Sequence, residues 1–208
     1  MNHEKLTGVA NIAYSTILLI TGILFYILFP VKEIGSNYSI LVISPGWVPV
    51  NILAMIATVF GIIGSIGIYA KQVDKSKYLS LIGFVFIIFG LVMKVSATSW
   101  EFSIWPAILQ NNPTNTLLTE SLIFKNTGIL SYYAVFTLFF MIGYIVFGIG
   151  SLKAKLFPKW ASILLIIGAP AYSILLSIPP FGLVGLVLYC VSIFGYGLSL
   201  FNSKKEGI

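Results

Sequence analysis

The stretch LSLIGFVFIIFGLVMKVSATSW, residues 79–100, decides the class of fold. It is long enough to cross the hydrocarbon core of a bilayer, which takes about 20 predominantly apolar residues in a helix. Its one charged side chain is Lys94. The stretch therefore predicts a membrane-spanning helix that carries a lysine inside the span.

The composition of the whole chain agrees with a membrane environment. Hydrophobic residues make up 58% of the 208 residues, charged residues make up 9%, and the mean hydropathy is +1.01. A soluble domain has about 25% charged residues. No polar block is large enough for a separate soluble domain, so we expect residues 1–208 to form a single transmembrane domain.

Apolar stretches of similar length recur along the chain. The long charge-free region before Lys204 exceeds one crossing, and Pro179-Pro180 divides it because proline disrupts a helix interior. We therefore predict an all-α, polytopic transmembrane helical bundle of about six spans. The spans are residues 8–30, 47–70, 79–100, 129–152, 160–178 and 181–201.

The lysines predict the orientation of this bundle in a cell membrane. All twelve basic residues are lysines, and nine of them lie in the tails and gaps on one side of the predicted spans. An excess of lysine marks the cytoplasmic side, so both termini are expected in the cytoplasm. The same pattern explains the net charge of +6 without a nucleic-acid partner. Nine lysines lie on the cytoplasmic side, Lys5, Lys71, Lys75, Lys77, Lys153, Lys155, Lys159, Lys204 and Lys205, and two lie opposite, Lys32 and Lys125.

The connection 101–128 is the longest that we expect on the outer side. Its apolar pieces predict a cap on the outer face of the bundle. In LLTESL, residues 117–122, the leucines form one stripe with Glu120 opposite, which favours a short interfacial helix. A plain loop packed on the bundle is the alternative. Trp47, Trp100 and Trp105 lie near the same boundary, where indole rings commonly anchor.

Lys94 is the best candidate for a functional site, because ionisable groups within a membrane are costly and usually face an interior or a cavity. Six residues separate it from Trp100, which places it about 9 Å below the outer interface. Glu101 is a conceivable ion-pair partner, and Asn51 a further polar neighbour. The ordinary interpretation is a structural lysine whose stem extends to the interface. The alternative is an outward-facing ligand or lipid site, for which the candidate residues are Lys94, Glu101, Asn51, Trp100 and Trp105.

Other chemistry has little support in the sequence. Cys190 and His3 each stand alone in their type, which argues against a redox pair, a metal site or a haem. The acidic residues fall outside or at the edges of the predicted spans, so a carboxylate relay for a proton-coupled carrier is missing. We expect no catalytic residues, cofactor or metal, and the question of an enzymatic activity leans towards no.

Two patterns concern helix packing and symmetry. Shifting the chain by 82 residues aligns Gly61 with Gly143 and Lys71 with Lys153, which is consistent with an internal repeat of helical hairpins. The positive-inside bias also accounts for the lysines. Small residues form a face on the second predicted span, suited to close helix packing within the bundle. They are Gly61, Gly64, Ser65 and Gly67.

Two segments carry a resemblance, SWEF (99–102) with WPA (105–107), and LFPKWA (156–161). They resemble those of a broad group of small uncharacterised prokaryotic multi-pass membrane proteins. That group has a Trp-Glu-…-Pro motif outside and a Phe-Pro-Arg/Lys-Trp-Ala turn inside. The resemblance covers mainly residues 79–200 and implies a topology of about six helices, and no activity.

Two functions fit these observations. The first is a non-enzymatic accessory, sensory or immunity-type protein that contacts membrane lipid, a membrane-protein partner or a second copy of itself. The second is a small carrier or channel with an outward-facing site near Lys94. A polar cavity that reaches Lys94 from the outer side favours the second function, whereas a lysine that faces lipid and extends to the surface removes its main support.

Overall fold

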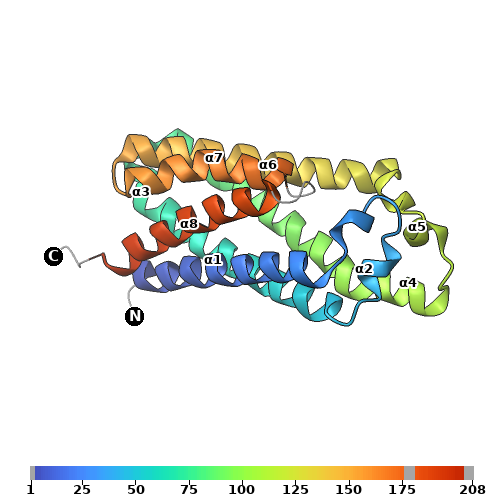
Figure 1. The fold of residues 1–208 in the computed structure, drawn as a ribbon. Coiled ribbons are helices and arrows are strands. Elements are labelled where there is room, and N and C mark those ends of the chain that lie inside the picture. The colour runs from blue at the N-terminus through green and yellow to red at the C-terminus, as the bar shows by residue number, and fades with distance from the viewer. Residues whose placement is uncertain (1–2, 176–180, 204–208) are drawn as a thin grey trace.

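The computed structural model describes residues 3–175 and 181–203, and every regular element in these residues is a helix (Figure 1). The predicted turn at Pro179-Pro180 lies outside the described residues. The long helices are α1 (His3–Leu28), α3 (Trp47–Ser99), α6 (Thr127–Ala154), α7 (Lys159–Leu175) and α8 (Phe181–Phe201). The short ones are η1 (Val31–Glu33), α2 (Ser39–Val42), η2 (Trp100–Ile104), α4 (Trp105–Asn111), α5 (Thr116–Thr119) and η3 (Leu122–Phe124).

Helix α3 reverses direction at Ser76, whose backbone is non-helical at φ −137° and ψ 42°. The rings of Tyr69 and Phe84 stack with centroids 4.5 Å apart, although a straight helix would separate these residues by about 22 Å. Two antiparallel arms result, residues 47–75 (the first arm) and 77–99 (the second arm). They correspond to the second and third predicted spans.

The six long segments form a closed ring. The first arm packs on α1 and the second arm on α6, and contacts continue from α6 to α7, α8 and back to α1. A ring of this size leaves space along its axis, which large aromatic side chains fill. Those that are fully buried are Tyr14, Tyr144, Phe147, Tyr189 and Tyr196.

Glycines allow the helices of the ring to approach closely. Gly64 faces Asn11 of α1, whose amide donates a 3.0 Å hydrogen bond to the Gly64 carbonyl. Gly61 and Gly67 face Tyr14 and Thr7 of the same helix. The small-residue face predicted from sequence therefore packs inside this chain, against α1.

The helices support a membrane location. In the described residues four are long and apolar enough to cross a membrane: α1, the continuous segment Trp47–Asn111, α6 and α8. Helix α7, of 17 residues, is shorter. Helix α1 begins and helix α8 ends at the same end of the bundle (Figure 1), where Lys71 lies 3.8 Å from Glu4 and donates to Ser203 at 3.0 Å.

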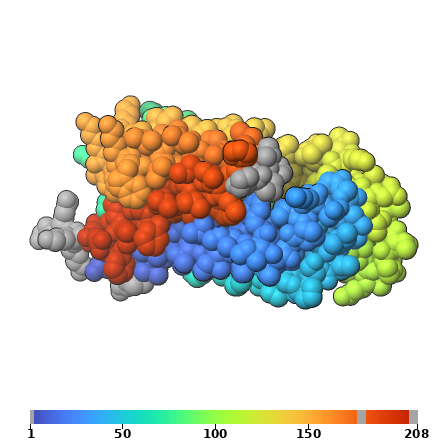
Figure 2. Space-filling view, viewed as in Figure 1, coloured from blue at the N-terminus to red at the C-terminus, as the bar shows by residue number. Residues whose placement is uncertain are grey.

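The opposite end carries a compact cap. Residues that share the cap core come from the 29–50 and 105–123 regions: Phe29, Tyr38, Leu41, Val42, Trp47, Val50, Trp105, Leu109, Leu118 and Ile123. In the space-filling view, the segment between α1 and α3 (blue) and the segment around α4 and α5 (yellow-green) form one continuous surface at this end (Figure 2).

The helical structure of the cap differs from the expectation. The second arm continues beyond Trp100 through a π-helical turn into α4, so the helix extends well into the expected cap 101–128. The expected interfacial helix is reduced to the single turn α5, because Ser121 adopts a left-handed conformation with φ 51°. Leu118 is fully buried in the cap core, which agrees better with the packed alternative.

The contact between the second arm and α6 gives a test of the packing. A methyl group added at Gly83 would come within 2.7 Å of the Phe147 backbone nitrogen, and backbone cannot move aside cheaply. We predict that Gly83→Ala lowers the free energy of unfolding by about 1–3 kcal/mol, as overpacking does. Thermal unfolding of the purified protein in detergent measures the change.

Gly128→Ala is the matched control. Gly128 lies exposed in the first turn of α6, and an added methyl group would meet only the Asn126 side chain, at 3.4 Å. This variant should unfold at the wild-type temperature or slightly above it, since alanine favours helix. Equal stability of the two variants would contradict the described contact.

Candidate functional site

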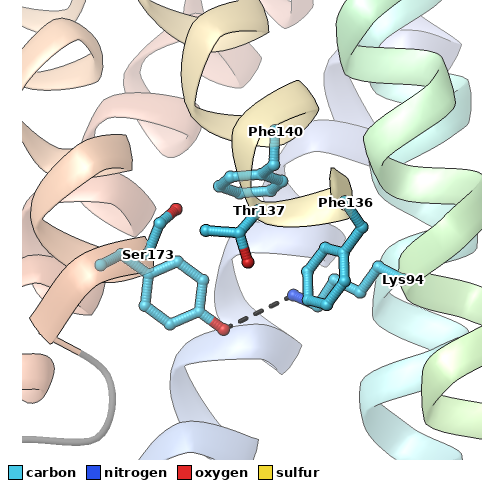
Figure 3. Close-up of a pocket in the computed structure, with 6 residues that line it drawn as sticks. Lys94, Phe136, Thr137, Phe140 and Ser173 are labelled. Atoms are coloured by element: carbon cyan, nitrogen blue, oxygen red, sulfur yellow. Dashed lines mark hydrogen bonds between the residues drawn. The ribbon is translucent and has the colours of Figure 1, made fainter. Parts of the chain in front are cut away.

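Lys94 lies on the second arm and extends toward α6 and α7, inside the ring (Figure 3). Its ammonium is 3.5 Å from the Tyr172 hydroxyl, a long hydrogen bond in which the lysine donates. The Nζ atom is also 5.4 Å from the centroid of the Tyr172 ring and 5.7 Å from that of Phe140. Both distances are within the range of cation–π attraction. Lys94 therefore faces aromatic groups of the bundle interior.

Two cavities meet at Lys94. The smaller, of about 70 Å³, lies toward α6 and α7 (Figure 3). The larger, of about 170 Å³, lies toward α1, the first arm and α8. Lys94 and Tyr172 line both. The remaining residues of the smaller cavity are Phe136, Thr137, Phe140 and Ser173.

Asn51 shares the larger cavity with Lys94. The two residues come together because α3 reverses, which places the start of the first arm beside the end of the second. The Asn51 amide nitrogen donates to the Trp47 carbonyl of its own helix at 2.9 Å. Asn51 thus lines the cavity, while its amide nitrogen is hydrogen-bonded within its own helix.

Glu101 has partners other than Lys94. Its carboxylate accepts hydrogen bonds from the Tyr38 hydroxyl at 2.7 Å and from the Tyr133 hydroxyl at 2.9 Å, and its carbonyl accepts one from Trp47 Nε1 at 2.7 Å. The ion pair conceived from sequence is not formed: within the described residues the one ion pair joins Lys71 to Glu4. Glu101, in η2, thus links Tyr38, in the segment between α1 and α3, to Tyr133 of α6.

Trp100 and Trp105 lie on the cap side of the structure. The Trp100 ring packs on Tyr132 with centroids 4.8 Å apart, and Trp105 is 6% exposed in the cap core. Neither lines the two cavities at Lys94. The candidates therefore form two groups, Lys94 with Asn51 at the cavities and Glu101 with the two tryptophans in the cap.

Sequence reasoning missed the aromatic partners of the lysine. Tyr172 stacks on Tyr189 with centroids 5.8 Å apart, and the Tyr189 hydroxyl is 2.9 Å from that of Tyr14. A hydroxyl-bearing aromatic cluster therefore extends from Lys94 along the axis. The available signal was tyrosine within apolar helices, since a buried tyrosine hydroxyl usually has a polar partner.

The side chains at the site are of types that can bind an anion. Lysine, tyrosine and asparagine can hold an anion, and the described residues contain no group of three or more His, Cys, Asp or Glu side chains placed to bind a metal ion. A comparison with protein-family models, curated proteins and solved structures finds no match to this chain. The functional argument therefore rests on the geometry of the site.

The bond from Tyr38 to Glu101 should stabilise the cap. Burial, and then the neighbouring Glu101 carboxyl, raise the pKa of Tyr38 well above its usual value, so its hydroxyl stays protonated and donates. Tyr38→Phe removes this donor and should lower the free energy of unfolding by about 1–3 kcal/mol. It should also speed hydrogen exchange in residues 30–46, measured by mass spectrometry.

Tyr78→Phe serves as the control, because Tyr78 is 74% exposed and loses nothing but a solvent contact. If residues 30–46 of Tyr38→Phe exchange hydrogen at the wild-type rate, the bond to Glu101 does not hold this segment in place.

Proposed function

We propose that this chain crosses a cell membrane six times, with both termini in the cytoplasm, and that it binds a small anion at Lys94. The topology is supported by the reversal of α3 and by the start of α1 and the end of α8 at the same end of the bundle. The lysine-rich turns at Ser76 and between α6 and α7 lie at that end, as the positive-inside rule requires of a cytoplasmic face.

Single cysteines test this topology in a Cys190→Ala background. Asn112→Cys, in the cap, should react with a membrane-impermeant maleimide on intact cells, whereas Lys77→Cys should react only after permeabilisation. Both positions are exposed in the fold, so membrane sidedness decides the labelling. Reaction of the two cysteines from the same side would contradict six crossings.

The binding function is carried by one observation: Lys94 is an ammonium at the junction of two cavities, without a carboxylate partner in the described residues. Placing a charged lysine in a membrane interior costs about 2.5–3.5 kcal/mol on insertion scales. The aromatic rings offset part of this cost, and a bound anion would offset more. A protein that binds an anion and does not convert it would suit an accessory or sensory role in the membrane.

A small carrier is the second candidate. It is favoured because Lys94 and Tyr172 line both cavities, the one toward α6 and α7 and the one toward α1, the first arm and α8. Groups along the path of a transported ligand are expected to contact it in this way. Uptake of the bound anion by proteoliposomes distinguishes the candidates: a carrier equilibrates it across the bilayer, whereas an accessory or sensory protein binds it without flux.

An anion panel tests the site itself. Acetate, inorganic phosphate and oleate are each added to the purified protein, and the unfolding temperature is recorded. We predict that at least one of them stabilises the wild type and fails to stabilise Lys94→Met, which keeps the length of the side chain and loses its charge.

Lys125→Met is the matched control, since Lys125 is an exposed lysine at the cap end. It should respond as the wild type does. The proposal fails if no member of the panel separates Lys94→Met from the wild type.

A further inference from the structure

The larger cavity at Lys94 has apolar walls and one charged end. Leu18 and Phe25 of α1, Val50 and Ala54 of the first arm, and Leu186 of α8 supply apolar surface. The hydroxyls of Thr21 and Thr98, which also line it, are satisfied by the carbonyls of Leu18 and Lys94 at 2.9 and 2.8 Å. The other polar side chains that line the cavity are Tyr26, Asn51 and Tyr172, and Lys94 is the one charged residue among the described residues that line it.

The size of the cavity restricts the shape of an occupant. Its volume of about 170 Å³ is below the roughly 300–1,000 Å³ that is usual for compact, drug-sized ligands. Such a space has room for one alkyl segment or a single small ring, and excludes a larger ring system. The apolar lining favours the alkyl segment, because each CH₂ group that leaves water contributes about 0.8 kcal/mol.

The charge of the site restricts the head group. Lys94 is the one cation among the residues lining the two cavities, and the Tyr172 hydroxyl beside it is an additional donor. One ammonium matches the single charge of a carboxylate, whereas a phosphate monoester carries about −1.5 to −2. The carboxylate of Glu101, at the same end of the second arm, is engaged by Tyr38 and Tyr133.

We infer that the ligand is a single-chain fatty acid, with its carboxylate on Lys94 and Tyr172 and part of its alkyl chain along α1, the first arm and α8. The inference rests on the proposed anion site and adds the class of molecule. A fatty acid partitions into the bilayer, so the ligand is supplied by the membrane in which the protein lies.

Photolabelling with a palmitic acid analogue that carries a diazirine in its chain tests this assignment on the full-length protein in detergent. Mass spectrometry should locate the label on peptides of α1, the first arm or α8. Oleate should compete, whereas acetate and inorganic phosphate should not. Lys94→Met should reduce labelling about ten-fold or more, as loss of a charged hydrogen-bond partner does, and Lys94→Arg should retain most of it.

Ala54→Leu tests the chain-binding part separately, because it narrows the larger cavity without altering Lys94. It should weaken labelling while acetate, if it stabilises the wild type, still does so. Size-exclusion profiles and unfolding temperatures establish that each variant is folded, and Lys125→Met should label as the wild type.

The outcomes separate the two proposals. Labelling that Lys94→Met leaves unchanged would overturn the anion site and the fatty-acid assignment together. Labelling that depends on Lys94, but is competed equally by acetate or phosphate and is unaffected by Ala54→Leu, would overturn the fatty acid alone. Stronger competition by lysophosphatidic acid than by oleate would likewise overturn it, in favour of a phospholipid head group.

Discussion

The reversal of α3 at Ser76 is the constraint on which the rest of the structure depends. Buried backbone groups that a break in a helix frees need hydrogen-bond partners. Here the hydroxyls of Ser76 and Ser80 lie 2.5 Å apart, and both donate to the Gln72 carbonyl, at 3.3 and 3.5 Å. The reversal turns one 53-residue helix into two arms. It places Asn51 at the cavity of Lys94, and it brings Trp47 within hydrogen-bonding distance of Glu101.

The interior of the ring is both aromatic and polar. Buried tyrosines supply much of the ring area of the core, and the hydroxyl of Tyr172 gives Lys94 a polar neighbour that an aliphatic side chain would not provide. The packing is less complete around Lys94, where the two cavities remain. Glycines allow close packing between α1 and the first arm and between the second arm and α6. A further hollow, of about 210 Å³ and with an apolar lining, lies between Phe86 of the second arm and α6.

The sequence predicted the helical class and the approximate helix positions, because length and apolar composition are sufficient for that. It also selected Lys94 by its charge. It did not predict Tyr172 and Phe140 as partners, since helices that are apolar on every side lack the periodicity that shows which face points inward. Glu101 was paired with Lys94 because they are close in sequence, whereas its actual partner Tyr38 is far away along the chain. The 82-residue repeat remains a prediction.

The central claim is that Lys94 faces the interior of the bundle. Nitroxide labels attached to Lys94→Cys and, separately, to Val92→Cys test it in liposomes, because molecular oxygen concentrates in lipid and broadens the spectra of lipid-facing labels. Val92 is 53% exposed on the outside of the same arm. We predict low oxygen accessibility at position 94 and high accessibility at position 92. Equal, high accessibility at both positions would place Lys94 in the lipid and contradict the account.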